Sequence, residues 1–246
     1  MTEKSSPARN RLVVMRNGGF TLIELAVTMF IIALLLGSIL VPLATQVEQR
    51  QISETQKKQE DIKDALTGYA VANGYLPCPA ISASNGLENR TAGVCAGNRN
   101  GFLPWQTLGV SKLDAWGRIY RYSVTLAFAS STTPFTLSTA ADITIQTRDT
   151  AGALATLSSN VPVVVLSQGK NGYGSIDNQG TAQALPSDWP ASNTDENTNA
   201  SGSTTFVSRT AQAANTTGTG GEFDDLLVWQ SRYVLLNRMV AAGKLP

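Results

Sequence analysis

Hydrophobic and polar positions divide the chain into three parts, the first two of which lie near the N-terminus. Residues 1–19 are polar and basic, with Lys4, Arg9, Arg11 and Arg16 against a single acid. From Phe20 to Ala44 the chain is almost continuously apolar, and Glu24 is the only charge. As a helix this run is about 37 Å long, enough to cross a hydrocarbon layer of about 30 Å. The pattern predicts a leader over 1–19 and a transmembrane helix beginning at Phe20.

The helix is predicted to continue as a stalk to residue 73. One stripe of residues recurs at helical spacing and is expected to lie partly on a sheet: Ile52, Thr55, Gln59, Ile62, Leu66 and Tyr69. Asn73-Gly74 and the prolines that follow end the helix. Pro42 is predicted to end the helix or to kink it, because proline removes a backbone hydrogen bond.

Residues 74–246 are predicted to form a globular head, beginning with a loop region over 78–115. A strand is predicted where apolar residues share one parity: Trp116, Tyr120, Tyr122, Val124, Leu126 and Phe128. A second strand is predicted in the same way from Phe135, Leu137, Ile143 and Ile145. The apolar run from Val161 to Leu166 is typical of a central strand. The fold class is therefore α+β, with a long N-terminal helix packed on an antiparallel sheet.

The C-terminal part of the head is less regular. Residues 187–222 are rich in Thr, Ser, Asn and Gly, and they are predicted to be a flexible surface loop or, more sharply, a binding loop. Leu226–Trp229 predicts a short strand. Residues 231–242 predict a terminal helix with Leu236 and Val240 facing inward, stopped by Gly243.

Composition excludes several classes of function. The chain has no histidine, so a Ser-His-Asp triad, a Cys-His dyad and an HExxH zinc site are impossible. A net charge of +1 gives no electrostatic case for nucleic acid. Gly169-Lys170-Asn171-Gly172 lacks the spacing of a phosphate loop and is interpreted as a turn. No enzymatic activity is expected.

The two cysteines, Cys78 and Cys95, are interpreted as a disulfide in an exported chain. Closing a loop of this length is worth about 3 kcal/mol in the entropic model. The alternative is a redox or metal pair, but the spacing is not CxxC, and two sulfurs without a histidine make a poor zinc site.

Glu24 separates the possible interpretations of the apolar run. A carboxylate inside a membrane segment costs about 2.5–3.5 kcal/mol, which a passive signal anchor has no reason to bear. A secretory signal would be cleaved after the run, where the chain matches an A-x-A pattern only weakly. Cleavage after Gly19 instead creates an amine on Phe20, and Glu24 of one subunit can pair with that amine in a neighbour.

The segment Gly19-Phe20-Thr21-Leu22-Ile23-Glu24-Leu25, after a basic leader and before an apolar helix, resembles the processing motif of type IV pilins and type II secretion pseudopilins. The resemblance implies cleavage between Gly19 and Phe20 by a prepilin peptidase, N-methylation of Phe20, and a role for Glu24 in assembly. It also implies a helix that bends near Pro42 and continues. The partners expected from it are other subunits and the inner membrane.

Three short pieces of the head are similar to segments of major pseudopilins: Asp114-Ala115-Trp116-Gly117, Ser167-Gln168-Gly169 and the run from Asp224 to Trp229. Some pseudopilins bind calcium in the corresponding loop region. Asp177, Asp224 and Asp225 are therefore candidate calcium ligands, since calcium prefers oxygen. The alternative is that these aspartates cap turns.

The function expected from the resemblance is that of a structural subunit, a minor pilin or a pseudopilin. The N-terminus would be cytoplasmic and the head periplasmic, because the basic residues all precede the helix. Two alternatives use the same scaffold: an adhesin or substrate-binding tip, and a signal-anchored periplasmic protein that does not polymerise.

Overall fold

The computed structural model describes residues 19–96, 98–187, 189, 191–202, 204–213 and 218–245, without the side chains of residues 37–42. The chain divides into two compact units, Met1–Glu48 and Gln49–Pro246. The helices are α1 (Leu22–Asn73), α2 (Trp105–Leu108), α3 (Leu126–Ala129), α4 (Thr194–Ser201) and α5 (Arg232–Ala241). The strands are β1 (Arg90–Thr91), β2 (Val94–Cys95), β3 (Asn100–Phe102), β4 (Arg121–Val124), β5 (Ile143–Arg148), β6 (Leu154–Val161), β7 (Val163–Ser167), β8 (Thr205–Val207) and β9 (Leu226–Gln230).

In the first unit, α1 begins two residues after the predicted start and carries exposed apolar side chains from Leu22 to Leu36. The helix continues past position 42, so it does not end at Pro42. The predicted kink falls on residues whose side chains the structure does not describe. Of the predicted leader 1–19, residues 1–18 lie outside the described residues. Within the described residues, no helix combines the length and hydropathy needed to cross a membrane.

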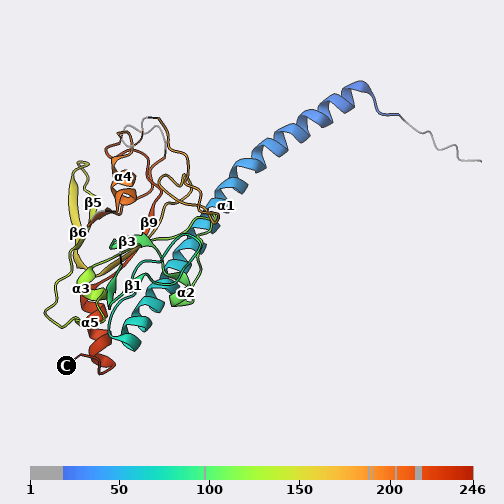
Figure 1. Cartoon of the computed structure of the whole chain (residues 1–246). Helices are drawn as coiled ribbons and strands as arrows, with labels where there is room; N and C mark the ends of the chain where they lie inside the picture. Colours follow the sequence, from blue (N-terminus) through green and yellow to red (C-terminus); the bar gives the residue numbers. More distant parts are fainter. Residues whose placement is uncertain are drawn as a thin grey trace, which may run out of the picture. The chain divides into compact units, whose positions relative to one another are not determined.

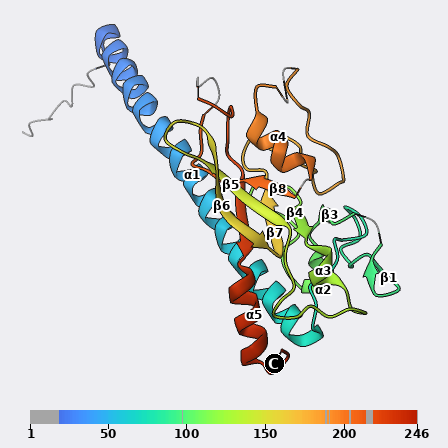
Figure 2. The ribbon, with the colours of Figure 1, turned by 90° about the vertical axis from the view of Figure 1, so that its left-hand side faces the viewer.

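In the second unit, the last turns of α1 bury one face against the head. Thr55, Gln59, Ile62 and Leu66 of the predicted stripe are 2% exposed or less, as is Ala70, whereas Ile52 and Tyr69 are only half-buried. The helix ends at Asn73, where Gly74 takes a left-handed conformation (φ 86°) and donates its N–H to the carbonyl of Ala70. In both views α5 lies alongside this end of α1 (Figures 1 and 2).

The strands of the described residues form three sheets. The largest has the order β3-β4-β7-β9 and is antiparallel throughout, as predicted. The second has the order β6-β5-β8, and its β5–β8 pairing is parallel, which corrects the expectation of a purely antiparallel head. The third is the small hairpin of β1 and β2.

Two hydrophobic cores meet at β7. Val163 and Val165 belong to the larger core, which α1 and α5 cover. Val164 belongs to a second core with Ile143, Ile145, Val161 and Phe206. Because successive side chains of a strand point to opposite faces, β7 is buried on both, which explains its continuous apolar sequence and confirms its prediction as a central strand.

The strand predicted from Trp116 to Phe128 is shorter than expected. Only β4 is extended, because the buried Asp114 carboxylate accepts the N–H groups of Trp116 and Arg118 at 2.9 Å each and turns the chain. After β4 the chain forms α3, in which Phe128 is buried and Leu126 is exposed. The alternation of apolar and polar residues in the sequence therefore continues past the end of β4, although the backbone there is no longer a strand.

The second predicted strand is likewise only partly formed. Ile143 and Ile145 lie in β5, but Phe135 and Leu137 precede it in a loop. The Phe135 ring packs on Phe128 with centroids 4.7 Å apart, whereas Leu137 is exposed. In the terminal helix Leu236 is buried as predicted, but Val240 is 42% exposed, because Met239 and Leu235 take the inward positions.

The prediction of a flexible loop over 187–222 is wrong for part of that segment. It contains α4 and β8, and Asp195, Glu196 and Phe206 are at most 3% exposed. Asp195 is held by two arginines, Arg148 of β5 and Arg209, through oxygen–nitrogen distances of 2.6–2.7 Å. Ion pairs therefore help to fix this polar segment to the second sheet, together with Phe206, which lies in the second hydrophobic core.

Candidate functional site

The N-terminal segment places the predicted processing site just outside the first helix. Gly19 and Phe20 are exposed and precede α1, and Phe20 is 85% exposed. The carbonyl of Thr21 accepts the N–H of Leu25 at 3.1 Å, the first bond of the helical ladder. Thr21 is therefore the N-cap residue of α1, and the peptide bond between Gly19 and Phe20 lies on irregular, accessible backbone.

Glu24 is tied to Thr21 by reciprocal hydrogen bonds. The backbone N–H and the side-chain hydroxyl of Thr21 both donate to Oε2 of Glu24 at 2.9 Å, and the N–H of Glu24 donates to Oγ1 of Thr21 at 3.3 Å. This is a capping box. The sequence prediction included Glu24 but missed Thr21, although the T-x-x-E spacing before an apolar run is the signature of this motif.

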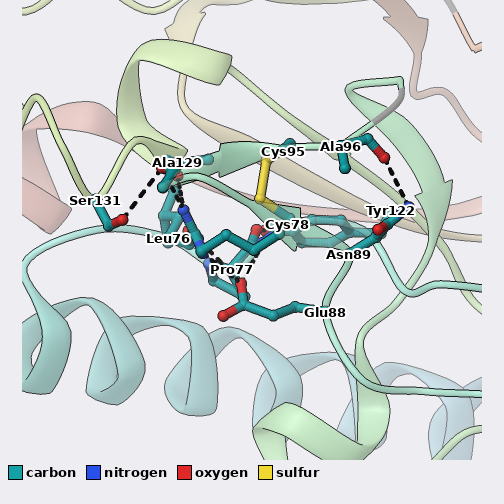
Figure 3. The surroundings of a disulfide bond; sticks show 12 residues. Leu76, Pro77, Cys78, Glu88, Asn89, Cys95, Ala96, Tyr122, Ala129 and Ser131 are labelled. Atoms are coloured by element: carbon teal, nitrogen blue, oxygen red, sulfur yellow. Dashed lines mark hydrogen bonds and ion pairs between the residues drawn. A yellow bond between two sulfur atoms is a disulfide. The ribbon is translucent and has the colours of Figure 1, made fainter.

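The predicted disulfide is present between Cys78 and Cys95, whose Cα atoms are 5.3 Å apart. Figure 3 shows the bond beside the segment that enters the head after α1. The hydroxyl of buried Tyr122 donates to the carbonyl of Pro77 at 2.8 Å, so the bridge is anchored to β4. These contacts assign the cysteine pair a structural role.

The ion pair of Glu88 and Arg90 organises the same loop. Oε2 of Glu88 accepts the N–H of Cys78 at 3.0 Å, and Oε1 accepts the hydroxyl of Tyr69 of α1 at 2.9 Å. Arg90 donates to Glu88 and to the carbonyls of Leu76 and Ala129. Burial alone would raise the pKa of Glu88, but the hydrogen bonds from Arg90, Cys78 and Tyr69 bring the pKa below its ordinary value.

Three carboxylates gather where α4 meets the segment before β9. One oxygen from each of Glu196, Asp224 and Asp225 lies within 4.8 Å of the others. Asp224 and Asp225 were candidates from the sequence, and the structure brings them together. Asp177 is not part of this group, because its Oδ1 accepts the N–H groups of Gln179 and Thr181 in a turn. Glu196 was missed, since it lies in α4, in a segment predicted to be a loop.

The cluster is largely buried and only partly satisfied. Asn171, in the turn after β7, donates its side chain to Glu196 at 2.9 Å and its N–H to Oδ2 of Asp224 at 2.7 Å. Asn199 donates to Oδ2 of Asp225 at 2.7 Å. The Oδ1 atoms of Asp224 and Asp225 are buried and have no hydrogen-bond partner. Residues 169–172, which include Asn171, form a glycine-rich turn, as interpreted from the sequence.

The electrostatics of the cluster follow from burial and like charge. Burial and the charge of Asp224 raise the pKa of Glu196 to about 7. Burial and nearby Glu222 raise the pKa of Asp224 to about 6. Burial raises the pKa of Asp225 well above its ordinary value, and Glu196 adds to the effect. Without a cation, burial and mutual repulsion therefore favour protonation within the cluster.

The donor set fits a hard cation. All three groups offer carboxylate oxygens, and the two orphaned oxygens are buried acceptors that need a partner. Two nearby arginines are engaged elsewhere: Arg118 donates to the carbonyl oxygens of Gly169 and Lys170, and Arg209 donates to Asp195. The residues present are therefore compatible with a calcium-sized ion.

The three head segments noted in the sequence meet in space. Ser167 at the end of β7 donates its hydroxyl to Oδ2 of Asp114 at 2.7 Å. Gly169 (φ 57°) lies so close to Asp224 that a Cβ atom there would be 2.3 Å from its carbonyl oxygen. Strand β7 pairs directly with β9, which follows Asp225. The three segments are thus in contact in the folded head, and the last of them carries Asp224 and Asp225 of the acidic cluster.

Comparison with known proteins adds evidence at the N-terminus. A family model described as the prokaryotic N-terminal methylation motif matches residues 14–40. No curated protein and no solved structure matches the chain. The matched segment contains Gly19, Phe20, Thr21 and Glu24, whose geometry is given above. The chain therefore carries the prokaryotic N-terminal methylation motif at residues 14–40, which is consistent with a type IV pilin or pseudopilin and supports a precursor of that kind.

Proposed function

We propose that the chain is a structural subunit, a minor pilin or pseudopilin, of a type IV pilus or a type II secretion pseudopilus. The observation that carries the proposal is the methylation motif at residues 14–40. The exposed apolar surface of α1 between Leu22 and Leu36 supports it, since such a surface needs lipid or neighbouring helices to cover it. The role is one of assembly rather than catalysis.

A prepilin peptidase cleaves the bond between Gly19 and Phe20 in this proposal. Hydrolysis consumes one water and leaves a carboxylate on Gly19 and an amine on Phe20. The amine then takes a methyl group from a sulfonium-type methyl donor, loses a proton and remains basic. The accessibility of Gly19 and Phe20 ahead of α1 supports this step, because proteases generally need their substrate backbone outside a helix.

Before assembly, the chain is anchored in the inner membrane with its N-terminus cytoplasmic and its head periplasmic. The basic residues before Phe20 favour this orientation. During assembly, the N-terminal part of α1 packs against other subunits, and Glu24 pairs with the Phe20 amine of a neighbour. This pairing offsets the cost of burying both charges and sets the axial register.

Mass spectrometry of the mature N-terminus, after co-expression with a prepilin peptidase, tests the processing step. The expected product begins at Phe20 and carries one added methyl group. An intact start at Met1, or a cut near Ala44, would contradict the proposal and favour an anchored or secreted protein.

Replacement of Glu24 tests the assembly step. Glu24→Gln keeps the size of the side chain but removes its charge, so membrane insertion and cleavage are expected to persist while incorporation into filaments falls at least ten-fold. The measurement is the amount of subunit in the sheared or cross-linked filament fraction, relative to processed subunit in the membrane. Wild-type incorporation would contradict the charge-pairing mechanism.

We propose further that Glu196, Asp224 and Asp225 bind calcium. The two buried, unpartnered carboxylate oxygens carry this proposal. A calcium ion bound there would offset two of the three negative charges of the cluster and hold α4 against the segment before β9. At calcium concentrations 100-fold above the dissociation constant, binding stabilises the head by about 2.7 kcal/mol.

Thermal unfolding of the processed chain in detergent, with calcium or with a chelator, measures this effect. Asp225→Asn is expected to abolish the calcium-dependent rise in melting temperature without destabilising the chelated protein, because an uncharged amide replaces a buried carboxyl group whose ionised form is already disfavoured. Asp177→Asn serves as the control and is expected to keep the full calcium response. A wild-type melting temperature that does not respond to millimolar calcium would exclude the site.

A further inference from the structure

The two oxygens of the Glu24 carboxylate have different environments. Oε2 receives two hydrogen bonds from Thr21, one from the backbone and one from the hydroxyl, both at 2.9 Å. Among the described residues, none donates a hydrogen bond to Oε1. Thr28, one turn further along, directs its hydroxyl to the carbonyls of Glu24 and Leu25. Thr21 is thus the side chain that holds the carboxylate.

This geometry reduces the freedom of an otherwise mobile side chain. A glutamate at an exposed helix start samples several rotamers, and fixing it at a contact costs conformational entropy. Two donors on one oxygen fix the carboxylate in advance and leave the other oxygen as an open acceptor. A cation that approaches from outside the chain then meets an oriented charge.

We propose that Thr21 is a positioning residue for assembly: it holds Oε2 of Glu24 so that Oε1 is presented to the Phe20 ammonium group of a neighbouring subunit. The inference rests on the proposed role of Glu24 and extends it to a second residue. Thr21 acts through Glu24 and does not itself contact the neighbour's amine.

A purely structural role for Thr21 makes a different prediction. If the residue only caps α1, then aspartate is an adequate replacement, because aspartate caps helices at least as well as threonine. If Thr21 positions Glu24, aspartate is harmful, since its carboxylate donates no hydrogen bond and repels Glu24. Serine keeps the hydroxyl and satisfies both roles, whereas valine keeps the shape and loses the hydroxyl.

The experiment replaces the native copy of the full chain with Thr21→Ser, Thr21→Val or Thr21→Asp, each with Glu24 and with Glu24→Gln. Mass spectrometry first measures cleavage and methylation, and membrane fractionation measures insertion. Incorporation is the amount of subunit in the sheared or cross-linked filament fraction, divided by the amount of processed subunit in the membrane. This ratio separates assembly from defects in processing.

With Glu24 present, Thr21→Ser is expected to incorporate within about two-fold of wild type. The incorporation of Thr21→Val is expected to fall by about five- to ten-fold, as the loss of one charge-assisted hydrogen bond implies. The incorporation of Thr21→Asp is expected to fall at least as much. In the Glu24→Gln background, Thr21→Val is expected to add no further loss, because two residues that act through one group are not additive.

Two results would overturn the inference alone: wild-type incorporation of Thr21→Asp while Glu24→Gln is defective, or an equal loss for Thr21→Val in both backgrounds. Wild-type incorporation of correctly processed Glu24→Gln would instead remove the proposed role of Glu24, and the positioning role with it. The Glu24→Gln measurement therefore tells the two failures apart.

Discussion

Buried carboxylates of the head differ in what compensates their charge. Glu88 has an arginine at 3.0 Å and two further donors, so its ionised form is favoured in the folded state. Asp225 has one amide donor and two acidic neighbours, so its ionised form is disfavoured. The head therefore contains both a paired buried charge, which supports the fold, and an unpaired acidic cluster, which needs a proton or a cation.

Glu88 should make the stability of the head depend on acidity. Its pKa in the folded state lies below the ordinary value of 4.5, so the stabilisation is present above pH 4.5 and is lost as the pH falls further. At pH 7, Glu88→Gln is expected to lower the free energy of unfolding by about 1–3 kcal/mol. Urea denaturation at several pH values measures the difference, which should shrink below pH 4.5.

Glu60→Gln is the matched control for this prediction. Glu60 pairs with Lys63 at the surface of α1, and its side chain is 59% exposed, so its removal should change stability little at any pH. A gap between wild type and Glu88→Gln that stays constant from pH 7 to pH 3 would count against the ionic role of Glu88.

At the scale of elements, the parts of the fold that bury apolar side chains could be predicted from the sequence. The buried stripe of α1 and the strands β7 and β9 lie where their patterns indicated. Helix α4 was missed because its buried side chains, Asp195, Glu196 and Asn199, are polar and are buried by pairing. Strand β6 was missed because most of its side chains at the sheet edge are exposed, so no alternation marks it.

The same reasons explain how much of the site was predicted. Gly19, Phe20 and Glu24 lie close together in the sequence, so the methylation motif that contains them could be found from the sequence alone. The acidic cluster joins Glu196 to two residues that are distant in sequence and is made only by the docking of α4. Asp177 was grouped with Asp224 and Asp225 because of the resemblance to a calcium-binding loop region, but its carboxylate is used locally in its own turn.

Asp195 is expected to be essential for the docking of α4. Its carboxylate is 1% exposed and accepts from Arg148 and Arg209, so Asp195→Asn leaves two arginines without their counter-charge. Loss of one partner of a buried ion pair costs about 3–5 kcal/mol. In Asp195→Asn, hydrogen exchange measured by mass spectrometry should be faster than in wild type in α4 and β8, and less changed in β7.

Asp149→Asn provides the comparison, since Asp149 lies in the same β5–β6 hairpin but accepts from the N–H groups of Ala151 and Ala153. It is expected to leave exchange in α4 unchanged. Slow exchange in α4 of Asp195→Asn would mean that other contacts hold the helix.

At the scale of the whole molecule, the two units have different requirements. Among the described residues, the first buried side chain along the chain is Thr55, so both cores belong to the second unit. The first unit has exposed apolar side chains and needs a surrounding medium or neighbours. The head is thus expected to fold without the N-terminal part of α1.

A fragment of residues 49–246 tests this independence. It is expected to be monomeric, to unfold in one cooperative transition, and to melt within a few degrees of the processed full chain in detergent. Circular dichroism and size-exclusion chromatography provide the measurements. A fragment that lacks a cooperative transition would show that the first unit is needed for the head to fold.

The position of β7 at the junction of the two cores has a consequence for the order of folding. Its hydrogen-bond partners are β4, which precedes it in the chain, and β9, which lies near the C-terminus. The central strand therefore cannot complete its pairing until nearly the whole chain is available. Such long-range pairing makes folding slow. Until β9 pairs with it, the uncharged run Val163–Leu166 lacks one neighbouring strand and is prone to aggregation. A subunit truncated before Leu226 is therefore expected to accumulate as aggregate rather than as a partly folded head.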